Sequence, residues 1–340
     1  MVCFIIDMAL GNLRLIALLV VSISFISCVQ VVDDVSSNSL SDPSLPSSDS
    51  SPISNPGNVP TPIPAAIQCR SDAQAFPAKW NFGANCAAEP AVQVHRYDAN
   101  TFMIRQSLCS NFEAPFLYML FGNNKVLLQD TGAGGIPIVS IVNDIINTWL
   151  AENNKTSIEL VVINSHGHGD HVGGNAALNN RPNTVVVGTS LAQVTQFFSI
   201  TNWPNEIKSY DLGGRMIDII PIPGHQAVHT ALYDHQSRIL LTGDTVYPGR
   251  LYIANFNQYR ASIDRLATYV ANKQVCHVLG THIEMTATAR IDFAAGSTFH
   301  PNERILQLSR SHLLELQSAV LGMAANPVIQ AHNDFIVYPL

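Results

Sequence analysis

Residues 166–171, which read His-Gly-His-Gly-Asp-His, constrain the fold and chemistry of this chain more than any other segment. They directly follow residues 158–163, a nearly continuous apolar run of the kind found in strands covered on both faces. Imidazole is the commonest metal ligand in proteins, and Gly167 and Gly169 let a loop turn so that neighbouring side chains converge. We therefore expect a metal-binding loop at the end of a buried strand; a solvated histidine-rich loop is the alternative.

Extended and helical patterns alternate along the rest of the chain. Besides 158–163, strands are expected within residues 92–107, 116–129, 184–187, 216–222, 230–242 and 275–279, with hairpin turns at 122–124 and 236–237. Apolar residues recur with helical spacing at 138–150, 191–198, 261–271 and 306–321, and 335–340 is expected to be an edge strand. Sheet segments interleaved with amphipathic helices predict an α/β (α+β) chain in which helices cover a layered sheet core.

The balance of charge narrows the classes of partner. The 340 residues include 18 Lys and Arg against 25 Asp and Glu, a formal net charge of −7, and no basic run interrupts the sequence. Electrostatic binding of the phosphates of nucleic acid is therefore not expected, and nucleic acid is excluded as a partner. A hydrophobic content of 47% supports a packed core. A small-molecule substrate fits this composition.

The first 28 residues have the features of an export signal. Arg14 precedes an apolar stretch that ends at Ser27 and Cys28, and this stretch is too short for a permanent membrane span. Residues 25–28 resemble a bacterial lipobox with Phe25 in place of the usual Leu, so we expect a chain lipidated on Cys28 and held on the periplasmic side of the envelope. That anchor is the one membrane contact expected. Simple cleavage and secretion is the alternative, and Met8 is an alternative start.

Residues 29–64 are predicted to be a disordered tether ahead of a catalytic domain at 65–340. From position 36 to 64 the segment is crowded with Ser, Pro, Asp and Asn and has no Lys or Arg, so it lacks the apolar surface to fold.

The cysteines outside the signal are Cys69, Cys86, Cys109 and Cys276. None has the Cys-x-x-Cys spacing of a metal or redox pair, and an even number in an oxidising compartment favours disulfides. Cys69 with Cys86 is the first pairing expected, because both lie in the lead-in to the domain. Free buried thiols are the alternative for Cys109 and Cys276.

Residues 166–171 resemble the His-x-His-x-Asp-His signature of the metallo-β-lactamase superfamily. Four further segments of that family's pattern occur in the family's order, each at the end of an expected strand or hairpin: residues 130–132 (Asp-Thr-Gly), 223–225 (Pro-Gly-His), 242–245 (Thr-Gly-Asp-Thr) and 280–282 (Gly-Thr-His). The resemblance implies a four-layer αββα sandwich with metal ions at one edge, where these loops gather.

The resemblance also implies roles for particular residues. It assigns His166, His168 and His225 to a first metal ion, Asp170, His171 and His282 to a second, and Asp244 to both. Asp170 is implied to move a proton as well, and Tyr247, like the tyrosine of related lactonases, to assist the developing oxyanion. An ordinary half-buried aromatic residue is the favoured alternative for Tyr247. Asp130 and His229 are expected to support the ligands from behind; a plain strand-end turn is the alternative for Asp130.

This ligand set is similar to those of glyoxalase II and the lactonases. It implies two divalent ions, zinc first and iron or manganese as alternatives, and a hydrolase in which a metal-bridging hydroxide attacks a carbonyl carbon. An ester or lactone is the expected substrate; a thioester or a β-lactam is the alternative. The thioester is disfavoured because no basic cluster of the glutathione-binding kind occurs near the C-terminus. A mononuclear iron oxidoreductase resembling the persulfide dioxygenases and an inactive binding protein are the candidates from other classes.

Overall fold

The computed structural model describes residues 69–323 and 326–340, which all belong to one compact unit, Ile63–Leu340. The predicted signal, lipobox and tether at 1–64 lie outside the described residues. Within the described part of the chain, no helix combines the length and apolarity that a membrane span requires.

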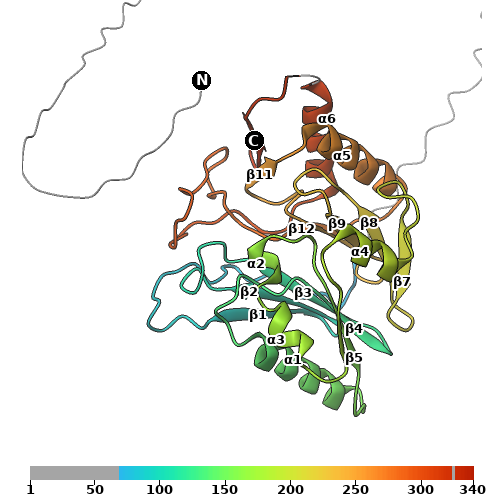
Figure 1. Cartoon of the computed structure of the whole chain (residues 1–340). Helices are drawn as coiled ribbons and strands as arrows, with labels where there is room; N and C mark the ends of the chain where they lie inside the picture. The colour runs from blue at the N-terminus through green and yellow to red at the C-terminus, as the bar shows by residue number, and fades with distance from the viewer. Residues whose placement is uncertain (1–68, 324–325) are drawn as a thin grey trace, which may run out of the picture. The chain divides into compact units, whose positions relative to one another are not determined.

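The first sheet has the strand order β1-β2-β3-β4-β5-β6, antiparallel through β4 and parallel from β4 to β6 (Figure 1). The expected turn at 122–124 joins β3 to β4, where the Gly122 amide donates to the Lys125 carbonyl at 2.9 Å. The strands of this sheet are β1 (Val92–Asp98), β2 (Thr101–Gln106), β3 (Phe116–Phe121), β4 (Lys125–Gln129), β5 (Glu159–Ile163) and β6 (Thr184–Val186).

The second sheet has the order β12-β10-β9-β8-β7, with β10 and β12 parallel and the expected hairpin between β9 and β10. Its strands are β7 (Lys208–Asp211), β8 (Met216–Pro221), β9 (Thr230–Asp234), β10 (Ile239–Gly243) and β12 (His277–Gly280). A small third sheet has the order β11-β14-β13, made of β11 (Arg250–Ile253), β14 (Ile336–Pro339) and β13 (Gln330–Ala331).

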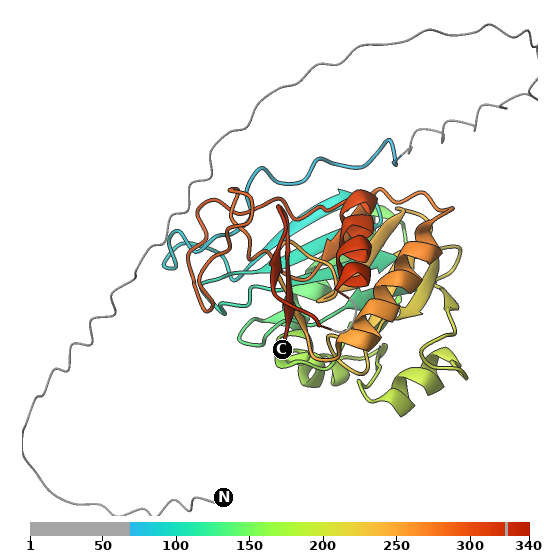
Figure 2. The ribbon, with the colours of Figure 1, turned by 90° about the horizontal axis from the view of Figure 1, so that it is seen from above.

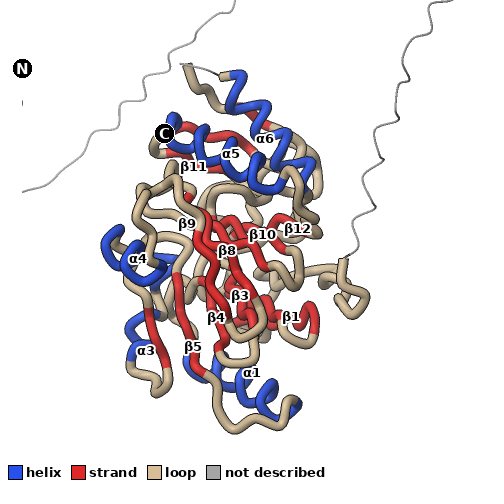
Figure 3. Tube along the Cα trace, turned by 90° about the vertical axis from the view of Figure 1, so that its right-hand side faces the viewer, coloured by secondary structure: helices blue, strands red, loops and turns tan. Residues whose placement is uncertain are grey.

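Helices cover the outer faces of the two large sheets, which gives the predicted four-layer αββα arrangement. Helix α1 (Ile138–Glu152) packs on the first sheet, and α5 (Phe256–Val270) and α6 (Arg310–Gly322) lie side by side over the second (Figures 1 and 2). In Figure 3 the strands lie between α1 on one side and α5 with α6 on the other. The shorter helices are α2 (Gly169–Val172), α3 (Asn175–Asn179) and α4 (Leu191–Phe198).

Strand β3 shows how the layers are held together. Its side chains alternate, so Tyr118 and Leu120 enter the core between the two sheets, while Leu117 and Met119 enter the core beneath α1. All four side chains are buried. A strand covered on both faces needs the continuous apolar run that the sequence has here.

Several boundaries and positions differ from the sequence expectations, and strands β7 and β13 and helices α2 and α3 were not expected. Helix α5 starts at Phe256, earlier than predicted, because the Asn255 side chain accepts from the Gln258 amide and caps it. Helix α6 starts later, at Arg310, because Leu308 forms a β-bridge with Val278 instead. The strand expected at the edge, β14, lies between β11 and β13 and is not an edge strand. Strand β11 was not expected at all.

The predicted pairing of Cys69 with Cys86 is wrong, and so is the alternative of free thiols. Cys69 is bonded to Cys276 and Cys86 to Cys109, with Cα–Cα distances of 5.6 and 5.2 Å. The lead-in reaches Cys276 because it runs beside β1: the Gln74 amide donates to the Tyr97 carbonyl at 2.6 Å. Pairing follows this packing and not closeness in sequence.

A buried ion pair joins the two sheets. The Arg215 guanidinium, 1% exposed, contacts the Asp234 carboxylate at 2.5 Å and donates to the carbonyl of Asn100 at 2.6 Å. Burial alone raises the pKa of Asp234, but Arg215 reverses this and holds the pKa below its usual value. Asp234 is therefore ionised in the core and satisfied by its partners.

Candidate metal centre

The candidate metal centre lies where strands of both large sheets end. In the first sheet, β4 leads to Asp130 and β5 to the loop at 164–171. In the second, β8, β10 and β12 run in the same direction and lead to His225, Asp244 and His282. Residues far apart in sequence meet because both sheets end at one edge of the sandwich.

The first ligand group comprises His166, His168, His225 and Asp244. Nε2 of His166 lies 2.8 Å from Nδ1 of His168 and 3.2 Å from Nε2 of His225, and Nδ1 of His168 lies 3.0 Å from Nε2 of His225. A tetrahedral zinc ion with Zn–N bonds of 2.0–2.1 Å needs ligand nitrogens about 3.3–3.4 Å apart. The three observed separations are shorter than this value by about 0.1–0.6 Å.

The second group comprises Asp170, His171, His282 and, again, Asp244. Oδ2 of Asp170 lies 3.1 Å from Nε2 of His171 and 3.3 Å from Nε2 of His282. Asp244 directs Oδ2 toward His171 at 3.3 Å and Oδ1 toward His282 at 3.3 Å. Its Oδ2 also lies 3.6 Å from Nε2 of His225, in the first group. Asp244 thus stands between the two groups.

The far nitrogens of three rings are fixed by oxygen acceptors. Nδ1 of His225 bonds to the carbonyl oxygen of Tyr252 and Nδ1 of His282 to that of Glu113, both at 2.8 Å. Nδ1 of His171 lies 3.0 Å from the Asp130 carboxylate. A carbonyl can only accept, so Nδ1 carries the proton in His225 and His282, and Nε2 offers a lone pair to the centre. This pattern fits metal ligation.

Asp130 holds the histidine loop from behind. Its Oδ1 accepts from the Ser165 amide at 2.6 Å, and its Oδ2 accepts from the Ser165 hydroxyl at 2.9 Å and faces Nδ1 of His171. The backbone of Asp130 is left-handed, with φ of 66°, a conformation that Asp tolerates better than most residues. Ser165, which also lies 3.1 Å from Nδ1 of His166, was not singled out by the sequence.

His229 is fully buried against the loop, its ring stacked on that of His166 with centroids 4.7 Å apart. Its Nε2 makes no hydrogen bond with any described residue. A Cβ at Gly243 would lie 2.5 Å from that nitrogen, and φ there is 52°, so only glycine fits beside it. The place of His229 is compatible with a supporting role, which stays a prediction, as does the role of Asp130.

The electrostatics of the site favour cations. Burial, with His171 next, lowers the pKa of His166 well below its usual value and keeps it neutral. Burial works the same way on His171 and His282, but Asp244 and other carboxylates outweigh it and raise both pKa values. Against their own burial, those two rings lower the pKa of Asp170 and Asp244. A carboxylate as buried as Asp244 needs positive charge beside it, which metal ions supply.

A cavity of about 300 Å³ opens onto both ligand groups; we call it the metal cavity. Tyr247 borders it, but its hydroxyl donates to the Arg250 carbonyl, with Glu284 at 3.3 Å. Burial, and then Glu284, raises the pKa of Tyr247 well above its usual value, so the phenol stays protonated. The hydroxyl is thus engaged by a backbone carbonyl, and the oxyanion role of Tyr247 stays a prediction. The metal cavity is lined by ligands from both groups and by Glu113, Tyr247, Tyr252, Ala254, Glu284 and Leu340.

Comparison with known proteins places this geometry in a family. The model of the metallo-beta-lactamase superfamily matches residues 159–295. A hydroxyacylglutathione hydrolase of Methylococcus capsulatus is 31% identical over 180 residues, which cover 52% of this chain and 70% of that protein. One of Pseudomonas entomophila is 29% identical over 162 residues, 46% of this chain and 61% of that protein. The matches thus span 61–70% of these relatives.

Among solved structures, a metallo-beta-lactamase from Pontibacter korlensis aligns with a TM-score of 0.47 and 19% identity, over 68% of this chain and 99% of that chain. The predicted fold class and the predicted class of enzyme, a hydrolase of this family, are confirmed, and the two ligand groups indicate divalent metals. The assignment of each residue to an ion stays a prediction. By its sequence and its site, the chain belongs to the metallo-β-lactamase superfamily.

Proposed function

We propose that this chain is a dinuclear metal-dependent hydrolase that cleaves a small carboxylic ester or lactone. The observation that carries the proposal is the position of Asp244, whose carboxylate belongs to both ligand groups. A shared carboxylate keeps two cations close together, as two-metal hydrolysis requires.

The nitrogens of His166, His168 and His225 would hold one ion, and Asp170, His171 and His282 the other, with Asp244 between them. Zinc suits this set because imidazole and carboxylate are its usual ligands in hydrolases and the ligand atoms of each group lie within 4.8 Å of one another. Iron or manganese can occupy similar donors. When bound, two such ions lower the pKa of water toward neutrality and polarise a carbonyl group.

The chain's own residues orient this chemistry. Backbone carbonyls of Tyr252 and Glu113 fix the rings of His225 and His282, so these ligands need no reorganisation on binding metal. Asp170 lines the metal cavity, and its Oδ1 makes no hydrogen bond with a described residue. We propose that this oxygen takes the proton released by the attacking water and returns it to the leaving group.

The second candidate is the thioester activity named for the relatives, a hydroxyacylglutathione hydrolase. Its support is their similarity to this chain. Against it stands the lining of the metal cavity, which includes Glu113 and Glu284 but, among the described residues, no Lys or Arg. Glutathione carries carboxylates that need cationic partners, so we rank an ester or lactone first.

Metal analysis and a substrate panel test the proposal together. Protein reconstituted with zinc is expected to retain two ions per chain and to hydrolyse simple esters or lactones faster than glutathione thioesters and β-lactams. One bound ion or fewer would refute the dinuclear site. Hydrolysis confined to thioesters would favour the second candidate, and oxygen uptake by the iron-loaded protein would favour an oxidoreductase.

We also propose that the chain acts outside the cytoplasm, as a lipid-anchored or secreted protein whose domain follows a tether. The cysteines within the described residues are joined in two disulfides, the state expected in an oxidising compartment. Mass spectrometry of the protein from its host should find a mature N-terminus at or after Cys28. An intact Met1 with all thiols reduced would refute export.

A further inference from the structure

A second, smaller cavity of about 80 Å³ continues from the metal cavity; we call it the side cavity. Glu113, Tyr252 and Glu284 line both. A substrate whose carbonyl lies at the ligand groups therefore has space for a further group beside these three residues. The remaining lining of the side cavity is Leu108, Phe112, Ala114, Arg250, Ile283, Ala294, Ala295, Gly296, Ser297 and His300.

Arg250 is the sole Lys or Arg among the described residues that line the two cavities, and it is already engaged. Its guanidinium contacts Glu284 at 2.9 Å and Asp292 at 2.7 Å and donates to the Phe293 carbonyl at 2.7 Å. Two carboxylates neutralise this one guanidinium, so the lining of the two cavities has no uncompensated positive charge for an anionic substrate.

Glu113 differs from the other carboxylates around these cavities. It is half-buried, and its carboxylate has no hydrogen-bond or ion-pair partner among the described residues, whereas Glu284 and Asp292 hold Arg250. A carboxyl group left unpaired beside a substrate cavity is available to a ligand.

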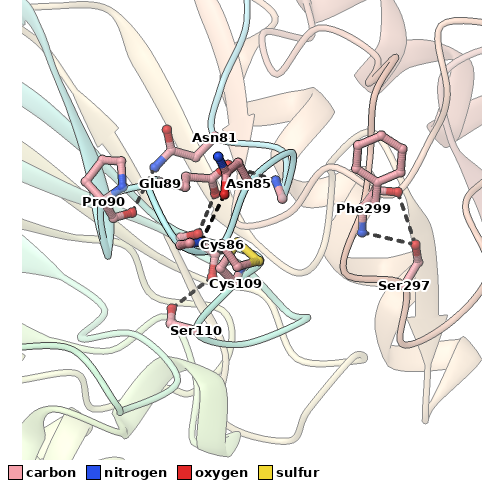
Figure 4. Close-up of a disulfide and its surroundings, with 12 residues drawn as sticks. Asn81, Asn85, Cys86, Glu89, Pro90, Cys109, Ser110, Ser297 and Phe299 are labelled. Carbon is pink, nitrogen blue, oxygen red and sulfur yellow. Dashed lines mark hydrogen bonds between the residues drawn. A yellow bond between two sulfur atoms is a disulfide. The ribbon is translucent and has the colours of Figure 1, made fainter.

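The backbone of Glu113 is held firmly. Its amide donates to Oδ1 of Asn111 at 2.9 Å, and its carbonyl accepts from His282. The Cys86–Cys109 disulfide ties down the start of the same loop (Figure 4), and the Ser110 hydroxyl donates to the Ser107 carbonyl at 2.8 Å. The side chain of Glu113 is therefore presented from a backbone whose own carbonyl contacts His282, a predicted ligand.

We propose that Glu113 determines substrate specificity by binding a positively charged ammonium group, attached close to the scissile carbonyl, against the aromatic ring of Tyr252. The proposal rests on the proposed hydrolase function and names its substrate class, cationic esters. The Glu113 carboxylate supplies the charge that recognises an ammonium group. The Tyr252 ring lines the same space, and it already has the Arg250 guanidinium over it, 6.0 Å from its centroid. An anionic group at this place would meet Glu113 and Glu284 with its charge uncompensated.

Three acetate esters of similar size test the proposal on zinc-loaded protein: acetylcholine, its neutral carbon isostere 3,3-dimethylbutyl acetate, and the anionic 3-carboxypropyl acetate. We expect kcat/KM to be about 10-fold higher for acetylcholine than for the isostere, mainly through KM, which is the size of one partly solvated charge contact. Glu113→Gln keeps the backbone carbonyl that holds His282 and should reduce this ratio to about 1.

Glu152→Gln removes the same charge from the exposed end of α1 and should leave the ratio unchanged. A binding measurement separates this proposal from the proposed function: calorimetric titration with choline should show weaker binding to Glu113→Gln than to the native protein at equal zinc content. If Glu113→Gln keeps the preference for acetylcholine or the affinity for choline, the proposal is wrong. If no ester is cleaved with two zinc ions bound, the proposed function fails, while the choline titration still decides the role of Glu113.

Discussion

Replacing Asp130 with asparagine tests whether this residue controls metal affinity from behind the ligands. Asparagine has nearly the same shape and tolerates the left-handed backbone at this position, so the turn itself should survive. Asp130 accepts from both the amide and the hydroxyl of Ser165 and faces Nδ1 of His171. An amide has one accepting oxygen. In either orientation its NH₂ group therefore faces donors that the carboxylate now satisfies.

The expected loss follows from these contacts. A buried hydrogen bond to a charged group contributes about 1.5–3 kcal/mol. At 1.4 kcal/mol per factor of ten, the affinity for the ion held by His171 should fall by about 10–100-fold. The affinity for the ion held by His166 should fall less, because Asp130 contacts His166 only through the Ser165 hydroxyl.

The assay is zinc titration of the metal-free protein against a competing chelator, with thermal unfolding of the metal-free form measured in parallel. Asp218→Asn is a matched control, because Asp218 also accepts from a serine hydroxyl and faces a histidine, at 2.5 and 2.7 Å, but lies outside both ligand groups. Unchanged zinc affinity in Asp130→Asn, or an equal fall in Asp218→Asn, would show that Asp130 has no specific role in metal binding.

Four further substitutions have distinct expected results. His168→Ala should abolish nearly all hydrolysis and leave one zinc ion per chain by elemental analysis, since the Asp170 group keeps its four ligands. Asp244→Ala should weaken zinc binding at both sites. Full activity in either variant would refute the dinuclear mechanism. Tyr247→Phe should lower the free energy of unfolding by about 1 kcal/mol in urea and the hydrolysis rate by less than about tenfold, because its hydroxyl donates to the Arg250 carbonyl. A rate loss above about 100-fold with both metals present would support the oxyanion role instead. Because folding lowers the pKa of Asp234, its ionisation contributes stability that is complete above the unfolded pKa near 3.9 and is lost as the pH falls through the folded pKa. Asp234→Asn should therefore lower the free energy of unfolding by about 3–5 kcal/mol at pH 7 and by less at pH 3. An equal loss at both pH values would contradict this prediction.

The sequence predicted those parts of the site that lie close together along the chain. The loop at 166–171 is recognisable because its ligands fall within six positions after an apolar strand. The distant ligands His225, Asp244 and His282 were reached through the family resemblance, and the structure brings them to the same edge. In the fold, most strands and helices were predicted because each has its own apolar period.

Contacts made by the backbone could not be predicted. The carbonyls of Tyr252 and Glu113 hold two histidines, but a carbonyl has no signature in a sequence. Disulfide pairing failed for a similar reason, since Cys69 and Cys276 are brought together by packing across a separation of 207 residues. Strand β11 and the central position of β14 likewise depend on a pairing between distant segments. Tyr247 shows that lining a cavity does not fix where a hydroxyl points.

Each ligand group contains residues that follow strands of both sheets, so metal content measures whether the two sheets have assembled. The histidine loop follows β5 of the first sheet, while His225, Asp244 and His282 follow strands of the second, so neither half of the sandwich holds a complete group. With the Cys69–Cys276 disulfide reduced, a chain cut between the halves, in the segment that joins α4 to β7, would regain tight zinc binding only when its two fragments dock. Zinc at 100 times its dissociation constant would favour the docked state by about 2.7 kcal/mol. The metal ions would then link two separately encoded fragments reversibly.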